Sequence, residues 1–284
     1  MKRKNFEPSR ISVHSPKSAR SLSEFVDRLQ ESGRYTFVRE EALRELHLNV
    51  ASLKKAVMRL AAKARVVVPR RGFYVIVPLE YRVAGAPPPT WFIDGLMLHL
   101  GHPYYAGLLS AAALYGAAHQ QPQEFQVITD RPQRLMRAGR SRIRFLVKKN
   151  IGSVAIEEHK TETGIIRVST PEATAIDILR YTSVVGGLSH AATVLVEFVE
   201  RIDRDKLAEA AKAEDDLAAV QRLGYILENV GADKQASILA DWINERSPRN
   251  IPLNPAKSMK GHPTNRRWRI VVNDTIELGK TAGR

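Results

Sequence analysis

The stretch that decides the N-terminal fold is NVASLKKAVMRLAAKARVVVPRRGFYVIV, residues 49–77. Its first half predicts a helix over residues 49–64: Asn49 is placed as an N-cap, and apolar residues recur on one face at Leu53, Ala56, Val57, Leu60 and Ala64. Its second half has two β-rich runs, 66–68 and 73–77, around a turn that ends in Gly72. This pattern predicts a β-hairpin directly after the helix.

The residues before this stretch predict two further helices. Leu22, Phe25, Val26 and Leu29 fall on one helical face, and residues 39–46 are good helix formers. The order of three helices followed by a hairpin predicts a winged helix-turn-helix over residues 21–78. A Pro-rich linker is expected at 79–90, where three consecutive prolines exclude a helix or strand interior.

Outside this unit we expect a disordered basic arm at 1–20 and a larger domain at 91–284. The arm could contact DNA or be a frayed terminus. The larger domain is predicted to be α+β because its expected strands and helices are grouped separately. We expect helices at 91–100, 104–118, 188–200, 203–212, 215–229 and 233–243, one opened by Thr170, and strands at 124–129, 142–147, 153–158, 164–168, 267–272 and 275–278.

The composition indicates a polyanionic partner. Lys and Arg number 44 against 30 Asp and Glu, which gives a formal net charge of +14 and suits nucleic acid or an anionic surface. No apolar run is long enough for a membrane helix, and no signal sequence is recognisable. There is no cysteine, which excludes disulfides and cysteine chemistry. We therefore expect a cytoplasmic protein with no membrane partner.

The basic residues of helix 49–64 and the hairpin are the predicted DNA contacts, because a recognition helix buries one face and presents donors on the other. Lys55 and Arg59 are one turn apart, and Arg70 and Arg71 stand at the hairpin turn. The full predicted set is Ser52, Lys54, Lys55, Arg59, Lys63, Arg70 and Arg71. The alternative is a winged helix that docks proteins instead of DNA.

A second basic run lies in the larger domain. It contains Arg131, Arg134, Arg137, Arg140, Arg142 and Arg144, followed by Lys148 and Lys149, with no acid between them. This possible second basic patch could extend the DNA contact, bind RNA or bind an acidic protein. A solvated loop and edge strand explains it equally well.

The sequence contains little that predicts catalysis. It has no Walker loop, no G-x-G-x-x-G and no nucleophile elbow. Asp94, His99 and His102 lie close together but not on one clean helical face. A nuclease-like site built from Asp130, Glu158 and Lys160 is the enzymatic alternative. We expect no enzyme activity, no metal and no cofactor.

Several strings resemble the AbiEi family of antitoxins, and together they extend over about residues 20–275. They include PRRGFYVIVP (69–78) with EYR (80–82), and PPP (87–89) with WFID (91–94). They continue with PYY (103–105), LLSAAA (108–113), HQQPQEFQV (119–127), RVSTPEAT (167–174) and QRLGY (221–225).

This resemblance implies a winged helix that binds inverted repeats in its own promoter and represses it. It also implies a C-terminal domain that counteracts a nucleotidyltransferase-like toxin without a stable complex, in systems that can provide phage defence. It transfers no catalytic residue. A transcription factor whose C-terminal domain senses a ligand or partner remains the other alternative.

Overall fold

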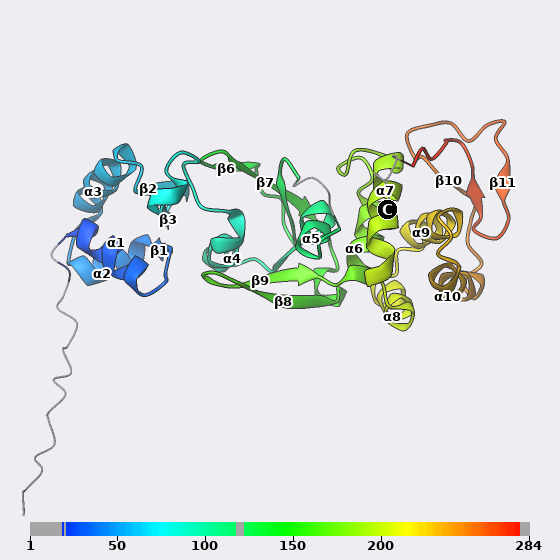
Figure 1. The fold of residues 1–284 in the computed structure, drawn as a ribbon, viewed down its shortest axis with the longest axis horizontal. Helices are drawn as coiled ribbons and strands as arrows, with labels where there is room; N and C mark the ends of the chain where they lie inside the picture. The colour runs from blue at the N-terminus through cyan, green and yellow to red at the C-terminus, as the bar shows by residue number, and fades with distance from the viewer. Residues whose placement is uncertain (1–18, 20, 118–121, 279–284) are drawn as a thin grey trace, which may run out of the picture.

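The computed structural model describes residue 19, residues 21–117 and residues 122–278. The chain forms an elongated molecule with the N-terminal helices at one end, a six-stranded sheet in the middle and a helical layer towards the other end (Figure 1). This arrangement confirms the predicted α+β class. Except for residue 19, the predicted basic arm at 1–20 lies outside the described residues.

The N-terminal part contains α1 (Leu22–Glu31), β1 (Thr36–Val38), α2 (Arg39–Leu46), α3 (Val50–Ala62), β2 (Val66–Arg70) and β3 (Phe73–Ile76). The three strands form an antiparallel sheet in the order β1-β3-β2. Asn49 caps α3 as predicted, because its side chain accepts a hydrogen bond from the Ser52 amide at 2.8 Å. Three helices and this sheet are the elements that a winged helix-turn-helix requires.

One face of each N-terminal helix meets in a small core. Phe25 and Val26 of α1 and Leu53 of α3 are buried there, together with Phe37 of β1. Ala64 is exposed instead of buried, because α3 ends at Ala62 and Ala64 adopts a left-handed backbone with φ of 51°. The predicted helix is therefore two residues too long.

The central sheet has the order β6-β7-β5-β4-β9-β8 and mixes parallel and antiparallel pairs. Around it lie α4 (Ile93–Leu100) and α5 (Leu108–Leu114) (Figure 1). The strands are β4 (Tyr104–Ala106), β5 (Phe125–Thr129), β6 (Met136–Ala138), β7 (Ser141–Val147), β8 (Ile156–Thr161) and β9 (Gly164–Ser169). The predicted helix at 104–118 is wrong in its first turn, because residues 104–106 pair with β5 and β9 inside the sheet.

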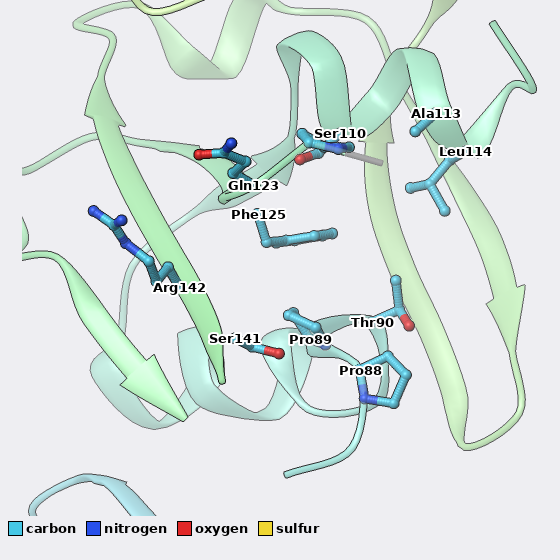
Figure 2. A pocket seen from close by; sticks show the side chains of 11 residues that line it. Pro88, Pro89, Thr90, Ser110, Ala113, Leu114, Gln123, Phe125, Ser141 and Arg142 are labelled. Carbon is cyan, nitrogen blue, oxygen red and sulfur yellow. The ribbon is translucent and has the colours of Figure 1, made fainter. Parts of the chain in front are cut away.

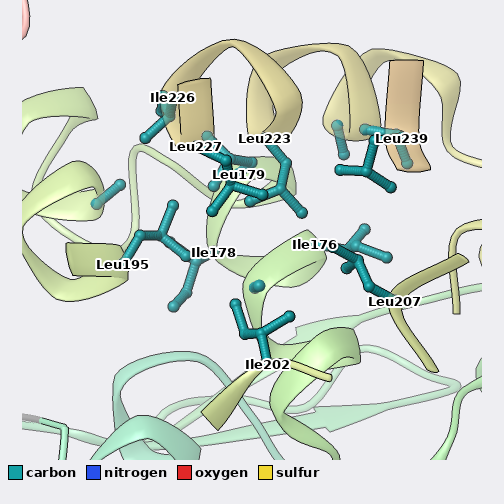
Figure 3. Packing of buried hydrophobic residues seen from close by; sticks show 14 of the residues in the cluster. Ile176, Ile178, Leu179, Leu195, Ile202, Leu207, Leu223, Ile226, Leu227 and Leu239 are labelled. Atoms are coloured by element: carbon teal, nitrogen blue, oxygen red, sulfur yellow. The ribbon is translucent and has the colours of Figure 1, made fainter. Parts of the chain in front are cut away.

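The helical layer forms the largest hydrophobic core. Its elements are α6 (Pro171–Arg180), α7 (Leu188–Phe198), α8 (Arg204–Glu214), α9 (Leu217–Asn229) and α10 (Asp233–Asn244). Figure 3 shows Ile176, Ile178 and Leu179 of α6 at the centre, with leucine and isoleucine side chains of the other helices around them. Thr170 caps α6 and Pro171 opens it, as the sequence predicts.

A short three-stranded sheet closes the described chain. It consists of β10 (Ile251–Pro252), β11 (Thr264–Asn265) and β12 (Ile270–Val271) in the order β10-β12-β11. The predicted pairing of 267–272 with 275–278 is wrong: β12 pairs with the two other strands, and 275–278 is not a strand. Trp268 is fully buried against Gly224 of α9, where an added Cβ would lie 1.9 Å from the indole.

A buried ion cluster joins the central sheet to the helical layer. Lys148 follows β7 and is only 3% exposed. It belongs to the basic run that was predicted to lie on the surface, and for this residue that prediction is wrong. Its ammonium lies 2.8 Å from Asp177 of α6 and 2.7 Å from Glu214 of α8. Tyr105 of β4 donates a hydrogen bond to Asp177 at 2.7 Å. A buried charge requires such partners, because its desolvation is otherwise strongly unfavourable.

Glu214 titrates differently from an ordinary carboxyl group. Burial raises its pKa to about 7, the nearby Asp177 carboxylate adds to this, and the Lys148 ammonium opposes it. Arg180 of α6 is a second cation near Glu214, with its Nη2 atom at 3.5 Å, but burial outweighs the effect of both cations on the pKa. Between pH ~4.5 and ~7 the native chain therefore holds a proton that the unfolded chain has released.

We expect the free energy of unfolding to fall as pH rises through this window, by about 3 kcal/mol at most from this group. Glu214→Gln keeps the shape of the side chain and should flatten that part of the profile. Urea unfolding at several pH values measures the slope. Glu31→Gln, at an exposed position, is the control and should leave the slope unchanged; an unaltered slope in Glu214→Gln contradicts the assignment.

Candidate nucleic-acid interface

The outer face of α3 presents the predicted helix contacts to solvent. Lys54, Lys55 and Arg59 are exposed, as are Ser52 and the C-cap residue Lys63. Among the described residues, no carboxylate lies within ion-pair distance of these cations. The first turn of α3 contains no acidic residue either. The face is therefore free to bind an anion.

Two apolar side chains share this face, and neither was predicted as a contact from the sequence. Val50 is 57% exposed and Met58 is 62% exposed, although each stands on a helix with a well-buried opposite side. They lie one turn before and one turn after Lys54, on the same side of α3 as that cation. The signal was in the sequence, since neither residue fits the buried repeat of Leu53, Val57 and Leu60.

A cleft of about 430 Å³ separates α3 from the hairpin. Lys54 and Met58 line its α3 side, while Val68 and Arg71 line its hairpin side. Arg39 also borders it but is already paired with Glu40 at 3.0 Å. Cationic and apolar side chains therefore line the same cleft, as in surfaces that contact both phosphates and base methyl groups.

The two arginines of the hairpin turn have different environments. Arg71 is exposed, whereas Arg70 is half-buried and donates a hydrogen bond from Nη2 to Gln133 Oε1 at 3.0 Å. The turn itself leans on α4: His99 Nε2 lies 3.3 Å from the carbonyl oxygen of Arg71, and the His99 ring packs on Phe73. Arg71 is therefore the available cation of the turn, and Arg70 joins the hairpin to the central domain.

The predicted second basic patch lies next to the hairpin, on and around β6 and β7. All six of its arginines are exposed: Arg131, Arg134, Arg137, Arg140, Arg142 and Arg144. Glu124, which lies outside the run, pairs with Arg142 at 2.7 Å and also with Arg144. Arg131 Nε lies 3.8 Å from Asp130. The Arg70–Gln133 hydrogen bond makes the patch continuous with the hairpin, which the sequence did not indicate.

A pocket of about 400 Å³ lies beside this patch. Figure 2 shows the ring of Phe125 between Ser110 on one side and Pro89 on the other, with Arg142 at one edge. Leu114 and Pro88 complete a mostly apolar wall. Its cation, Arg142, is held by Glu124, so the pocket offers shape and apolar surface but little unpaired charge.

The residues of the enzymatic alternative are not brought together. Asp130 follows β5, whereas Glu158 and Lys160 lie on β8, the edge strand three positions away in the sheet. At about 4.8 Å per strand this is roughly 14 Å, too far for one metal ion. Within the described ranges, no group of three or more His, Asp or Glu side chains could hold a metal.

The Asp94, His99 and His102 group also separates. Asp94 accepts a hydrogen bond from the Tyr104 hydroxyl at 2.9 Å, and His99 faces Arg71. His102 Nδ1 lies 3.1 Å from Asp130 Oδ1. Each side chain has its own partner, so the three do not form a common site.

Known proteins share part of this sequence and most of this fold. Residues 105–229 match the family model described as the AbiEi antitoxin C-terminal domain. The fold is similar to the crystal structure of the RV2827C protein from Mycobacterium tuberculosis, with a TM-score of 0.62 and coverage of 89% of this chain and 92% of that chain. Sequence identity is 15%, so this likeness concerns the fold alone. A search among curated proteins finds no significant match. In the part of the chain that is described, no helix has the length and apolar character to cross a bilayer.

Proposed function

Because residues 105–229 match the AbiEi antitoxin C-terminal domain family, we propose that the chain is the antitoxin of an AbiE-type toxin–antitoxin system. Its N-terminal part acts as a winged helix that binds promoter DNA, at inverted repeats, and represses transcription. Its C-terminal domain counteracts a nucleotidyltransferase-like toxin without forming a stable complex. The chain acts as a regulator in the cytoplasm and not as an enzyme.

The outer face of α3 is the observation that supports DNA binding. Lys54, Lys55 and Arg59 are exposed without carboxylate partners in the described chain, on a helix capped by Asn49 and buried on its other side. A helix of this kind fits the major groove of B-DNA, where exposed donors read base edges. The family match supports the antitoxin role, and α3 supports the promoter-binding role.

We expect Lys55→Ala with Arg59→Ala to weaken binding to the promoter by about 10- to 100-fold for each base that these side chains read. Titration of a labelled promoter duplex measures the affinity. Arg204→Ala with Lys206→Ala, on the exposed surface of α8, removes the same charge and is the matched control. Equal affinity of the two double variants would show that α3 does not read the promoter.

We expect Val50 and Met58 of α3 to contact thymine methyl groups, because exposed apolar side chains on a recognition helix can meet these groups in the major groove. Replacing the thymines of the promoter duplex with uracil should weaken binding by the wild-type chain about fourfold for one methyl group. Met58→Ala should reduce that difference. Met259→Ala, an exposed methionine far along the chain, should leave it intact; if Met58→Ala also leaves it intact, the contact is absent.

Co-expression with the adjacent gene tests the antitoxin role. We expect the adjacent gene to be toxic alone and the full chain to restore growth. Lys55→Ala with Arg59→Ala should restore growth equally well when expressed from a foreign promoter, while losing repression of a reporter fused to the native promoter. A harmless neighbour, or no rescue by the full chain, contradicts the antitoxin proposal and leaves DNA binding to be judged separately.

A further inference from the structure

A third basic surface lies near the end of the chain, away from α3, the hairpin and the second basic patch. Residues 246–273 contain no Asp or Glu, and their basic residues are Arg246, Arg249, Lys257, Lys260, Arg266, Arg267 and Arg269. Most of these are arginines. Guanidinium groups bind phosphate oxygens in a bidentate manner, which makes this composition informative about the partner.

The C-terminal sheet gathers these arginines from two separate segments. Residues 246–249 lead from α10 into β10, and residues 266–269 form the turn between β11 and β12. The Ile251 amide donates to the carbonyl oxygen of Arg269 at 2.9 Å. The Gln221 side chain donates to the carbonyl oxygens of both Arg249 and Trp268, at 3.0 and 2.9 Å. The two segments are therefore held side by side, and we call Arg246, Arg249, Arg266, Arg267 and Arg269 the C-terminal arginine cluster.

The cluster keeps an excess of positive charge. Arg267 pairs with Glu228, and Arg246 Nη1 lies 3.4 Å from Glu245 while its guanidinium stacks over Trp242. Arg249, Arg266 and Arg269 are exposed, and no carboxylate of the described chain lies within ion-pair distance of them. Like charges held together repel one another, and an external anion relieves that repulsion.

We propose that the C-terminal arginine cluster binds the phosphate backbone of duplex DNA, at a site separate from α3 and the hairpin. The second patch around β6 and β7 also keeps three arginines without a carboxylate partner in the described chain, but it adjoins the hairpin through the Arg70–Gln133 hydrogen bond, whereas the C-terminal arginine cluster lies apart from the hairpin (Figure 1). The surface offers charge and hydrogen-bond donors without base-reading geometry, so the binding is independent of DNA sequence.

Apolar anchors for a protein partner are lacking at this surface. Protein–protein contacts are centred on buried aromatic or aliphatic side chains. Within residues 246–273, all of which are described, Met259 is the exposed large apolar side chain, at 38% exposure, and it lies outside the two arginine segments. Trp242 and Trp268 are themselves buried in the fold. The phosphate backbone of a nucleic acid therefore fits this surface better than an acidic protein does.

The C-terminal arginine cluster lies far from α3. Helix α3 lies at one end of the long molecule, and the β10–β12 sheet lies towards the other end (Figure 1). Two DNA-binding surfaces at opposite ends allow one chain to hold two duplex segments, or two parts of one bent duplex. This goes beyond promoter recognition, and it does not depend on α3 reading a sequence.

The test uses the full chain with Lys55→Ala and Arg59→Ala, and a duplex that lacks the promoter sequence. Into this background we introduce Arg249→Gln, Arg266→Gln and Arg269→Gln, which remove charge but keep the apolar stems. We expect about tenfold weaker binding at low salt, and a slope of log affinity against log salt that is shallower by about 2 to 3. Arg204→Gln, Lys206→Gln and Lys212→Gln on α8 remove the same charge at exposed positions and should leave both values near those of the background.

Three outcomes overturn the proposal. Equal affinity and salt slope in the arginine variant and the α8 control would make the change an effect of net charge alone. If binding to the duplex persists while binding to single-stranded RNA of equal length disappears, the surface belongs to RNA. If duplex binding persists while rescue from the toxin disappears, the surface belongs to a protein. Failure of α3 to recognise the promoter affects none of these readouts.

Discussion

The junction of the central sheet and the helical layer depends on neutralising the ammonium group of Lys148, which is buried there. A charge in this position is tolerable only when carboxylates are held within hydrogen-bond distance, and here Asp177 of α6 and Glu214 of α8 supply them. Tyr105 of β4 adds a hydroxyl to Asp177. One strand end and two helices must therefore meet at fixed positions, and the rest of the helical layer packs on α6 within that arrangement.

Local sequence patterns predicted the N-terminal part well because its helices and strands are determined by interactions between residues that are close in the sequence. The Asn49 cap, the buried repeat of Leu53, Val57 and Leu60, and the hairpin are all determined by neighbours in sequence. Long-range contacts caused the errors. Residues 104–106 have a helical pattern but become a strand because β5 and β9 lie on both sides of them. Lys148 has the pattern of a solvated residue, but its partners come from 29 and 66 residues away.

For the candidate interface the sequence was informative about charge but not about its arrangement. The exposed cations of α3 follow from helical periodicity. Periodicity does not predict that Arg70 binds Gln133, or that Glu124 screens Arg142 and Arg144. The C-terminal arginine cluster was missed for a similar reason, since its two segments are separated in sequence by the loop between β10 and β11. The net charge of +14 is thus distributed over several surfaces with different freedom to bind.

The packing of the hairpin against α4 has a consequence for how the protein can be engineered. Phe73 and Val75 of β3 share a hydrophobic cluster with Phe92, Ile93 and Leu96, and the Arg71 carbonyl faces His99. The N-terminal unit is therefore packed against the central domain through β3, the hairpin turn and α4. A chimera that joins this unit to a foreign C-terminal domain would expose the apolar side of β3. The N-terminal unit can therefore be transferred to another protein only together with α4 and the residues between the hairpin and α4.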